Sequence, residues 1–373
     1  MRFRARLASL MVLHGLVAHA GLAAAQATAT LRGRDARVID IERFDGSAVI
    51  GEVAGSRVVL TWDRVRAVDG SGDAALARLL SAGDALWRGK TRLDRGDPIA
   101  AVAALEQAFD VFSAEPGHTA RVSSDALLAA RLALGQAERS VVPWLHLREQ
   151  SAALLDAPGA LRTETDEEWG LVQDLPPIFV PSRSAARIAA DVAADGLLGW
   201  TEGPNRRLAE VYASALLIAA GESPPPLDWE PPSEPVGLVR SIVEARSDDP
   251  RRRAVARADL RRWLADQERS WVKAWCHAAI GLSLLNESES ERLAGIGHLL
   301  IVPSVYGDAQ PYLAGVCLAE AAQALANAGR AEAAARLVDT LSRRSPRHPA
   351  LALPSLRGLR AAATSSQTNG IGT

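Results

Sequence analysis

The chain of 373 residues is long enough to bury a large core in one or two domains, and its hydrophobic content of 48% is that of a globular protein. Lysine and arginine total 42 against 44 aspartates and glutamates, which gives a formal net charge of −2. This balance argues against a nucleic-acid-binding protein, because such proteins carry a basic footprint for the phosphate backbone.

The N-terminal residues 1–27 predict an export signal. Three arginines within the first six residues precede a mostly apolar stretch at residues 7–22, and small residues then supply A-x-A cleavage sites. The apolar stretch is shorter than the ~20 residues of a membrane-spanning helix. We therefore expect a signal peptide, export to the periplasm or the extracellular space, and no stable membrane span after cleavage.

Residues 36–70 predict a small β module. Ile39 and Ile41 alternate with polar neighbours, and Asp45-Gly46 is the dipeptide favoured in a tight hairpin. Three further strands are expected at residues 47–53, 57–62 and 65–68. A module of about 35 residues buries too little apolar surface to be stable alone. We expect a meander or small open barrel that docks on the following domain.

From residue 73 to residue 352 the hydrophobic period is that of helices. Leu79, Leu86 and Leu93 recur at seven-residue intervals, which places them on one helical face. The sequence Gly96-Asp97-Pro98 then ends that helix, and proline suits the first turn of the next one. The pattern predicts a helical hairpin.

A hairpin with the same spacing is predicted near the C-terminus. When the two turns are aligned on Gly96 and Gly329, small residues fall seven positions before each glycine and five positions after it. These small residues, which let two helices approach closely, are Gly89, Ala101, Ala322 and Ala334. They resemble the tetratricopeptide repeat, a helix–turn–helix unit of ~34 residues. The resemblance implies a mainly α fold, an α-solenoid of helical hairpins preceded by the β module.

Two proline-containing segments interrupt the helical pattern, at residues 174–181 and 221–235. Proline breaks helices, so neither is expected to be helical, and the second is expected to be a stiff extended connector. The second either separates two helical subdomains or crosses the surface between helices, and the apolar helices on both sides favour the surface path. The small polar residues at 361–373 predict a disordered tail.

Two charged stretches have structural interpretations. The sequence TETDEE at residues 163–168 lacks the ligand spacing of a calcium loop and predicts a solvated charged loop. The sequence DDPRRR at residues 248–253 predicts the start of a helix, because acidic side chains favour the positive end of the helix dipole.

No motif indicates a nucleotide, a metal ion or another cofactor. The sequence RGKT at residues 88–91 resembles the end of a phosphate-binding loop, but the glycine that such a loop requires is replaced by Asp84. The histidines lack the spacing of a metal site. Cys276 and Cys317 are either buried thiols or a disulfide between neighbouring helices.

The leading hypothesis is an exported, non-enzymatic interaction or scaffold protein that binds a protein, a peptide or an envelope component. In the tetratricopeptide-repeat family, the binding groove is lined chiefly by the first helix of each pair. By this resemblance, Lys90 and Asp94 in the first unit are expected to face the partner. Gln323 and Asn327 are expected to do so in the last unit.

Two alternatives stay open. In the first, the chain is an envelope enzyme, such as a hydrolase, whose site is assembled from distant residues such as His277, His298 or Asp308. In the second, it is a structural adaptor whose β module and helical surface each hold a partner. A polar cleft in which either histidine meets carboxylates would favour the enzyme. An open groove without convergent titratable groups would favour binding.

Overall fold

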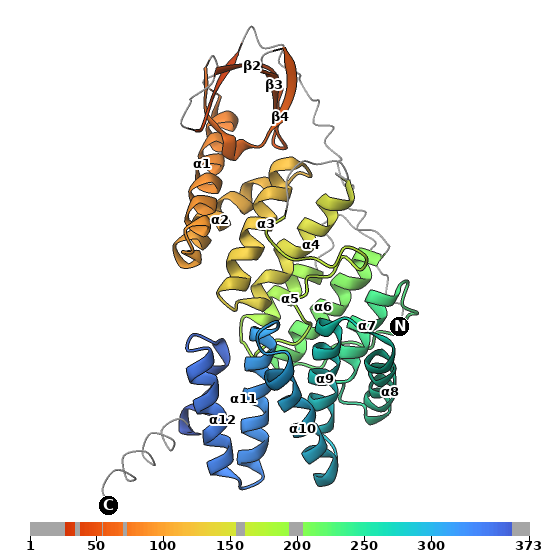
Figure 1. The fold of residues 1–373 in the computed structure, drawn as a ribbon. Helices are drawn as coiled ribbons and strands as arrows, with labels where there is room; N and C mark the ends of the chain where they lie inside the picture. The colour runs from red at the N-terminus through yellow and green to blue at the C-terminus, as the bar shows by residue number, and fades with distance from the viewer. Residues whose placement is uncertain are drawn as a thin grey trace, which may run out of the picture.

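The computed structural model describes residues 27–33, 38–53, 55–69, 73–153, 161–193 and 204–359. The predicted signal peptide, apart from Ala27, and the predicted disordered tail lie outside these residues. In the described part the fold is mainly α, with a five-stranded antiparallel sheet at its N-terminal end (Figure 1).

The sheet has the strand order β4-β3-β2-β1-β5 and is not closed into a barrel. Its strands are β1 (Thr28–Leu31), β2 (Val38–Phe44), β3 (Val49–Val53), β4 (Ser56–Leu60) and β5 (Val65–Asp69). The hairpin predicted at Asp45-Gly46 is confirmed, since it joins β2 to β3 and the Asp45 carboxylate accepts hydrogen bonds from the backbone N–H groups of Ser47 and Ala48. Strand β1, between β2 and β5, is not predicted by the sequence pattern.

Trp62 joins the sheet to the helices. It begins the short 3-10 helix η1 (Trp62–Arg64), where the sequence predicted the end of a strand. Its indole Nε1 donates to the carbonyl oxygen of Asp45 at 2.8 Å, and its backbone N–H donates to the Thr119 hydroxyl at 3.2 Å. On the helical side, a Cβ added at Gly83 would lie 2.5 Å from the Trp62 carbonyl oxygen, so this close approach requires glycine.

The helices follow one another as packed neighbours, which is compatible with a helical repeat (Figure 1). They are α1 (Ala74–Asp94), α2 (Pro98–Phe112), α3 (His118–Ala133), α4 (Ala137–Ala153), α5 (Ala185–Ala193), α6 (Pro204–Ala220), α7 (Glu234–Glu244), α8 (Pro250–Asp266), α9 (Ser270–Leu284), α10 (Glu289–Val305), α11 (Pro311–Asn327) and α12 (Ala331–Arg344), followed by the 3-10 helix η2 (Pro349–Ala352). Helix α9 also contacts both α7 and α11, so alternate helices of successive hairpins pack together.

Both predicted helical hairpins are confirmed, as α1–α2 and α11–α12. Their turn glycines, Gly96 and Gly329, have φ angles of 73° and 74°, a left-handed conformation that favours glycine. The predicted close approach is also present at Gly89, where an added Cβ would lie 2.6 Å from the side chain of Leu105. The spacing of small residues therefore identified a real helix contact.

Residues 161–182, here called the inner segment, are largely buried between helices. Its apolar residues are 0–6% exposed at positions 171, 172, 175, 178, 179 and 180. Tyr212 of α6 donates to the carbonyl oxygen of Leu175 at 2.7 Å, and Trp275 of α9 donates to that of Gln173 at 3.2 Å. Residues 174–181 form no helix, as the prolines predict, but the segment occupies interior space.

The charged stretch at residues 163–168 is only in part the solvated loop that the sequence predicts. The Asp166 side chain is 12% exposed and accepts a hydrogen bond from Arg269 at 3.0 Å. Its other oxygen accepts from the backbone N–H of Trp169, over whose ring the Arg269 guanidinium lies 4.7 Å from the centroid. This carboxylate therefore anchors one end of the inner segment.

Cys276 and Cys317 are free, buried thiols, so the disulfide alternative is wrong. Burial raises the pKa of Cys276 to about 12 and also raises the pKa of Cys317. Neither thiol is ionised at neutral pH, and their role in the described structure is packing.

We expect the folded protein to lose stability in acid because of the buried imidazole of His146 on α4. It is 5% exposed, lies edge-on to Phe109 at 5.1 Å between ring centroids, and burial lowers its pKa from 6.5 to about 4. The unfolded chain binds a proton on His146 more readily than the folded chain does. The contribution of His146 to the free energy of unfolding therefore has its full value above pH 6.5 and decreases as the pH falls towards 4. We expect His146 to account for about 3 kcal/mol of this loss. Urea unfolding at pH 7 and pH 4 measures it, and an equally acid-sensitive His146→Leu variant would contradict it.

Candidate functional site

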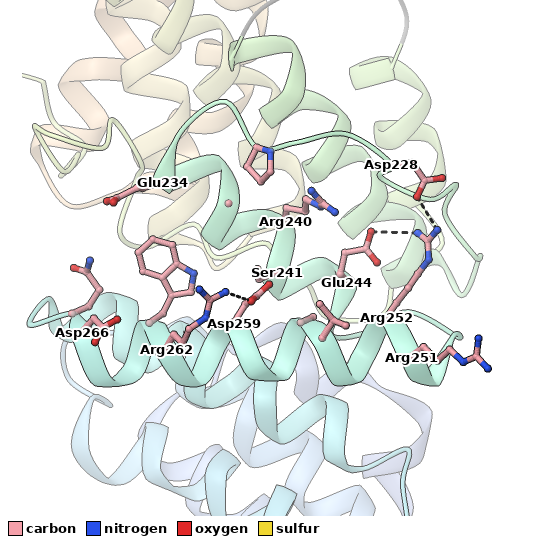
Figure 2. A pocket seen from close by; sticks show the side chains of 16 residues that line it. Asp228, Glu234, Arg240, Ser241, Glu244, Arg251, Arg252, Asp259, Arg262 and Asp266 are labelled. Atoms are coloured by element: carbon pink, nitrogen blue, oxygen red, sulfur yellow. Dashed lines mark hydrogen bonds and ion pairs between the residues drawn. The ribbon is translucent and has the colours of Figure 1, made fainter.

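A groove of about 740 Å³ lies between α8 and the chain that leads into and forms α7 (Figure 2). We call it the α7–α8 groove. Its walls come from residues 228–244 on one side and residues 251–267 on the other. It is open to solvent, and its volume lies within the range of about 300–1,000 Å³ that is usual for ligand sites.

The start of α8 confirms the helix predicted at residues 248–253. Asp249 is the N-cap, its carboxylate accepts a hydrogen bond from the Arg251 backbone N–H at 2.8 Å, and Pro250 occupies the first turn. Two arginines on the other face of the helix, Arg253 and Arg257, are buried against Glu287. One arginine-rich helix therefore has one face that is fixed in the core and one that lines the groove.

The opposite wall is held in place by Trp229. The guanidinium groups of Arg207 and Arg240 lie 4.9 and 5.5 Å from its ring centroid, and Arg240 also donates to its backbone carbonyl oxygen. The proline-rich segment at residues 221–235 thus runs along the surface between α6 and α7, which pack against each other. This outcome agrees with the surface path favoured by the sequence.

The groove has a different charge at each end. Figure 2 places Arg251 at one end and Glu234 and Asp266 at the other, and these three side chains are exposed and have no ion pair within the described residues. Between these ends Val255 is 64% exposed and Trp263 is half-buried, and the ion-paired Asp259 and Arg262 lie between them along α8. The exposed, unpaired charges are therefore one cation at one end and two anions at the other, with apolar side chains and ion-paired charges between them.

Lys90 lines a second hollow of about 360 Å³, here called the junction pocket, and Asp94 pairs with Arg162 of its wall. The pocket is bounded by β4 and η1, by α1 and α3, and by Leu161-Arg162. The Lys90 Nζ is 2.5 Å from a carboxylate oxygen of the buried Asp63, and the Asp94 carboxylate is 2.6 Å from the Arg162 guanidinium. Both predicted site residues thus make ion pairs within the chain, and their contact with a partner stays a prediction.

Gln323 and Asn327 are not brought near Lys90 and Asp94. Gln323 is half-buried and Asn327 is exposed at the end of α11. Figure 1 places α1 beside the sheet and α11 towards the opposite end of the molecule. The four predicted residues therefore lie at two separate places, and the inner segment occupies space between α4, α6, α9 and α11.

His277 and His298 meet each other. Their Nδ1 atoms are 3.0 Å apart, so one imidazole donates and the other accepts. Burial lowers the pKa of both, that of His277 to about 4, and both are neutral at pH 7. Asp308 is exposed, and within the described residues no hydrogen bond or ion pair connects either imidazole to a carboxylate. The described side chains also include no group of three or more that could hold a metal ion.

Comparison with protein-family models, with curated proteins and with solved structures finds no match for this chain. Among the described residues, no helix combines the length and the apolar character needed to cross a bilayer. The arrangement of side chains in the α7–α8 groove is therefore the main basis for a functional hypothesis.

Proposed function

We propose that this chain is an exported, non-enzymatic interaction protein that holds a polypeptide partner in the α7–α8 groove. The observation that carries the proposal is the arrangement of side chains along this open groove: an unpaired arginine at one end, two unpaired carboxylates at the other, and the partly exposed apolar side chains of Val255 and Trp263 between them. Export rests on the N-terminal sequence, and a tetratricopeptide-like repeat architecture rests on the two hairpins with matching small residues.

This order of groups fits a peptide better than a small ligand. Arginine forms paired, charge-assisted hydrogen bonds with a carboxylate, so Arg251 fits an acidic side chain of the partner. Val255 and Trp263 provide apolar contact between the two charged ends. Glu234 and Asp266 then fit a basic side chain. The proposed partner segment thus carries an acidic residue, an apolar residue and a basic residue in that order.

The enzyme alternative has one observation in its favour, the contact between His277 and His298. A general base also needs a group that orients it and a substrate pocket beside it. The pair instead satisfies its own hydrogen bond, which supports a structural role. Binding is therefore the function that the arrangement of groups supports best.

Capture of partners from envelope extract tests the proposal with matched variants. Val255→Asp and Arg251→Glu change exposed groove residues and are expected to lower partner recovery at least tenfold, because each places a charge that opposes the proposed contact. Ile99→Asp on α2 is the control, since Ile99 is 60% exposed and lies outside the groove. Partner binding should be confirmed with the purified partner by calorimetry.

Equal recovery by wild type and groove variants would overturn the groove assignment, as would an equal loss in the Ile99→Asp control. Lys90→Ala and Asp94→Ala in the same experiment test the residues that the sequence predicted. Unchanged partners in both variants would contradict a partner contact at those two positions while leaving the α7–α8 groove untouched.

A further inference from the structure

Some of the positively charged side chains that line the junction pocket have no acidic partner within the described residues. Of its four cationic side chains, Lys90 and Arg162 have acidic partners. Arg64 and Arg121 have neither an ion pair nor a side-chain hydrogen bond within the described residues. Two guanidinium groups from different elements, η1 and α3, therefore line one hollow, and neither has an ion pair within the described residues.

Arg121 gives the more specific observation. Its Nε–H is buried and has no acceptor in the structure. Buried N–H groups in folded proteins nearly always have an acceptor, so this group calls for one that the described chain does not supply. An oxyanion in the junction pocket, which Arg121 lines, would neutralise its guanidinium group.

The position of the pocket adds to this preference for an anion. It lies along the first two turns of α3, where the backbone N–H of Thr119 already donates to the carbonyl oxygen of Ser47. The N-terminal end of a helix carries a partial positive charge. His118, the first residue of this helix, also lines the pocket.

One acidic side chain, Asp125, lines the same pocket. It is 5% exposed, and its carboxylate accepts hydrogen bonds from the backbone N–H groups of Arg162 and Thr163 at 2.9–3.2 Å. Burial raises the pKa of this carboxyl group. Asp125 is thus bonded to the backbone of the inner segment and does not neutralise Arg64 or Arg121.

We infer that the junction pocket binds the phosphate group of a small phosphate monoester. Two guanidinium groups match the oxygens of a phosphate by paired hydrogen bonds, and the nearby Lys90 ammonium adds a further positive charge. Val59, Val122 and Leu161 add apolar contact beside the polar Thr61 and His118, and the volume of about 360 Å³ leaves room for an organic group beside the phosphate.

Isothermal titration of the full chain at low salt tests this inference, with inorganic phosphate, phenyl phosphate and acetate as probes. Both phosphates should bind, phenyl phosphate more tightly because of the apolar side chains, and acetate at the same ionic strength should not. Arg64→Gln and Arg121→Gln should each weaken phosphate binding about tenfold or more. Arg78→Gln, an exposed arginine of α1 outside the pocket, is the control and should bind as wild type does.

The absence of phosphate binding by the wild type would overturn the inference, and so would equal binding of acetate or an equal loss in Arg78→Gln. Arg64 is exposed, so its variant should keep the unfolding midpoint of the wild type and separate binding from folding. Vesicles of phosphatidylcholine with and without phosphatidic acid distinguish the source of the phosphate. Selective binding to the acidic vesicles assigns a lipid headgroup, and binding to the soluble monoester alone assigns a free metabolite.

Discussion

The Glu287→Ala variant is expected to be less stable than wild type by about 3–5 kcal/mol, because it leaves two buried arginines without their anion. One carboxylate oxygen of Glu287 accepts hydrogen bonds from Arg253 at 2.9 Å and from Arg257 at 2.8 Å. The arginines are 7% and 8% exposed. Their hydrogen bonds hold the pKa of Glu287 below its usual value, so the carboxylate stays charged at neutral pH.

Chemical unfolding measured by circular dichroism gives the change in the free energy of unfolding. Glu287→Gln keeps an acceptor and loses only the charge, so it should be less destabilising than Glu287→Ala. Glu332→Ala is the control, because Glu332 pairs with Arg336 in an exposed i,i+4 bridge and its side chain is 89% exposed. That variant should change stability by less than about 0.5 kcal/mol. Similar changes in the free energy of unfolding for Glu287→Ala and Glu332→Ala would contradict the stabilising role of Glu287 beside the two buried arginines.

Phe179→Ala is the second substitution with a large expected effect, also about 3–5 kcal/mol. Phe179 lies in the inner segment, is 1% exposed, and its ring centroid is 6.4 Å from that of Tyr212. Removing its ring leaves a cavity at the place where the segment is fixed between helices. Because the segment has no helix of its own there, the loss should also open it to proteolysis.

Two measurements check this expectation. Urea unfolding gives the loss of stability, and limited proteolysis under native conditions should produce a new cleavage within residues 161–182. Leu293→Ala on α10 is the control, since Leu293 is 48% exposed and its truncation should have little effect. Wild-type stability and protease resistance in Phe179→Ala would show that the inner segment is not fixed by this side chain.

Local spacing predicted the parts of the fold that local interactions determine. Gly96 and Gly329 mark turns because a left-handed residue ends each helix, and Asp45-Gly46 marks a hairpin because its side chain caps the turn. Strand β1 was not predicted, because four residues show too little alternation to indicate a strand. Its conformation depends on pairing with β2 and β5 on either side.

The inner segment could not be placed from sequence because its contacts are distant along the chain. Gln173 meets Trp275 across 102 residues, and Val180 meets Tyr312 across 132 residues. A run of apolar residues and prolines is equally compatible with a connector on the surface and with a buried segment. Whether it is buried depends on the helices that pack over it, which come from distant parts of the sequence.

The candidate sites were predicted in part. Lys90 was selected as a surface residue of a first helix, and the structure places it at the junction pocket, but its pairing with Asp63 depends on how the sheet docks. The α7–α8 groove was missed because the charged start of α8 was interpreted only as a helix start. The exposed Val255 among regularly spaced charges was the signal that could have indicated a second, functional face.

The inner segment also bears on how this molecule folds and unfolds. In ordinary repeat arrays each unit contacts only its neighbours, so units can be added, deleted or melted nearly one at a time. In this protein the inner segment accepts hydrogen bonds from α6 and α9 and donates one to α11. These elements are therefore coupled into a single cooperative unit with a high contact order, which folds more slowly than a neighbour-only array of the same length. Deleting the last hairpin, α11–α12, would remove the contact between Tyr312 and the inner segment and so destabilise the middle of the chain.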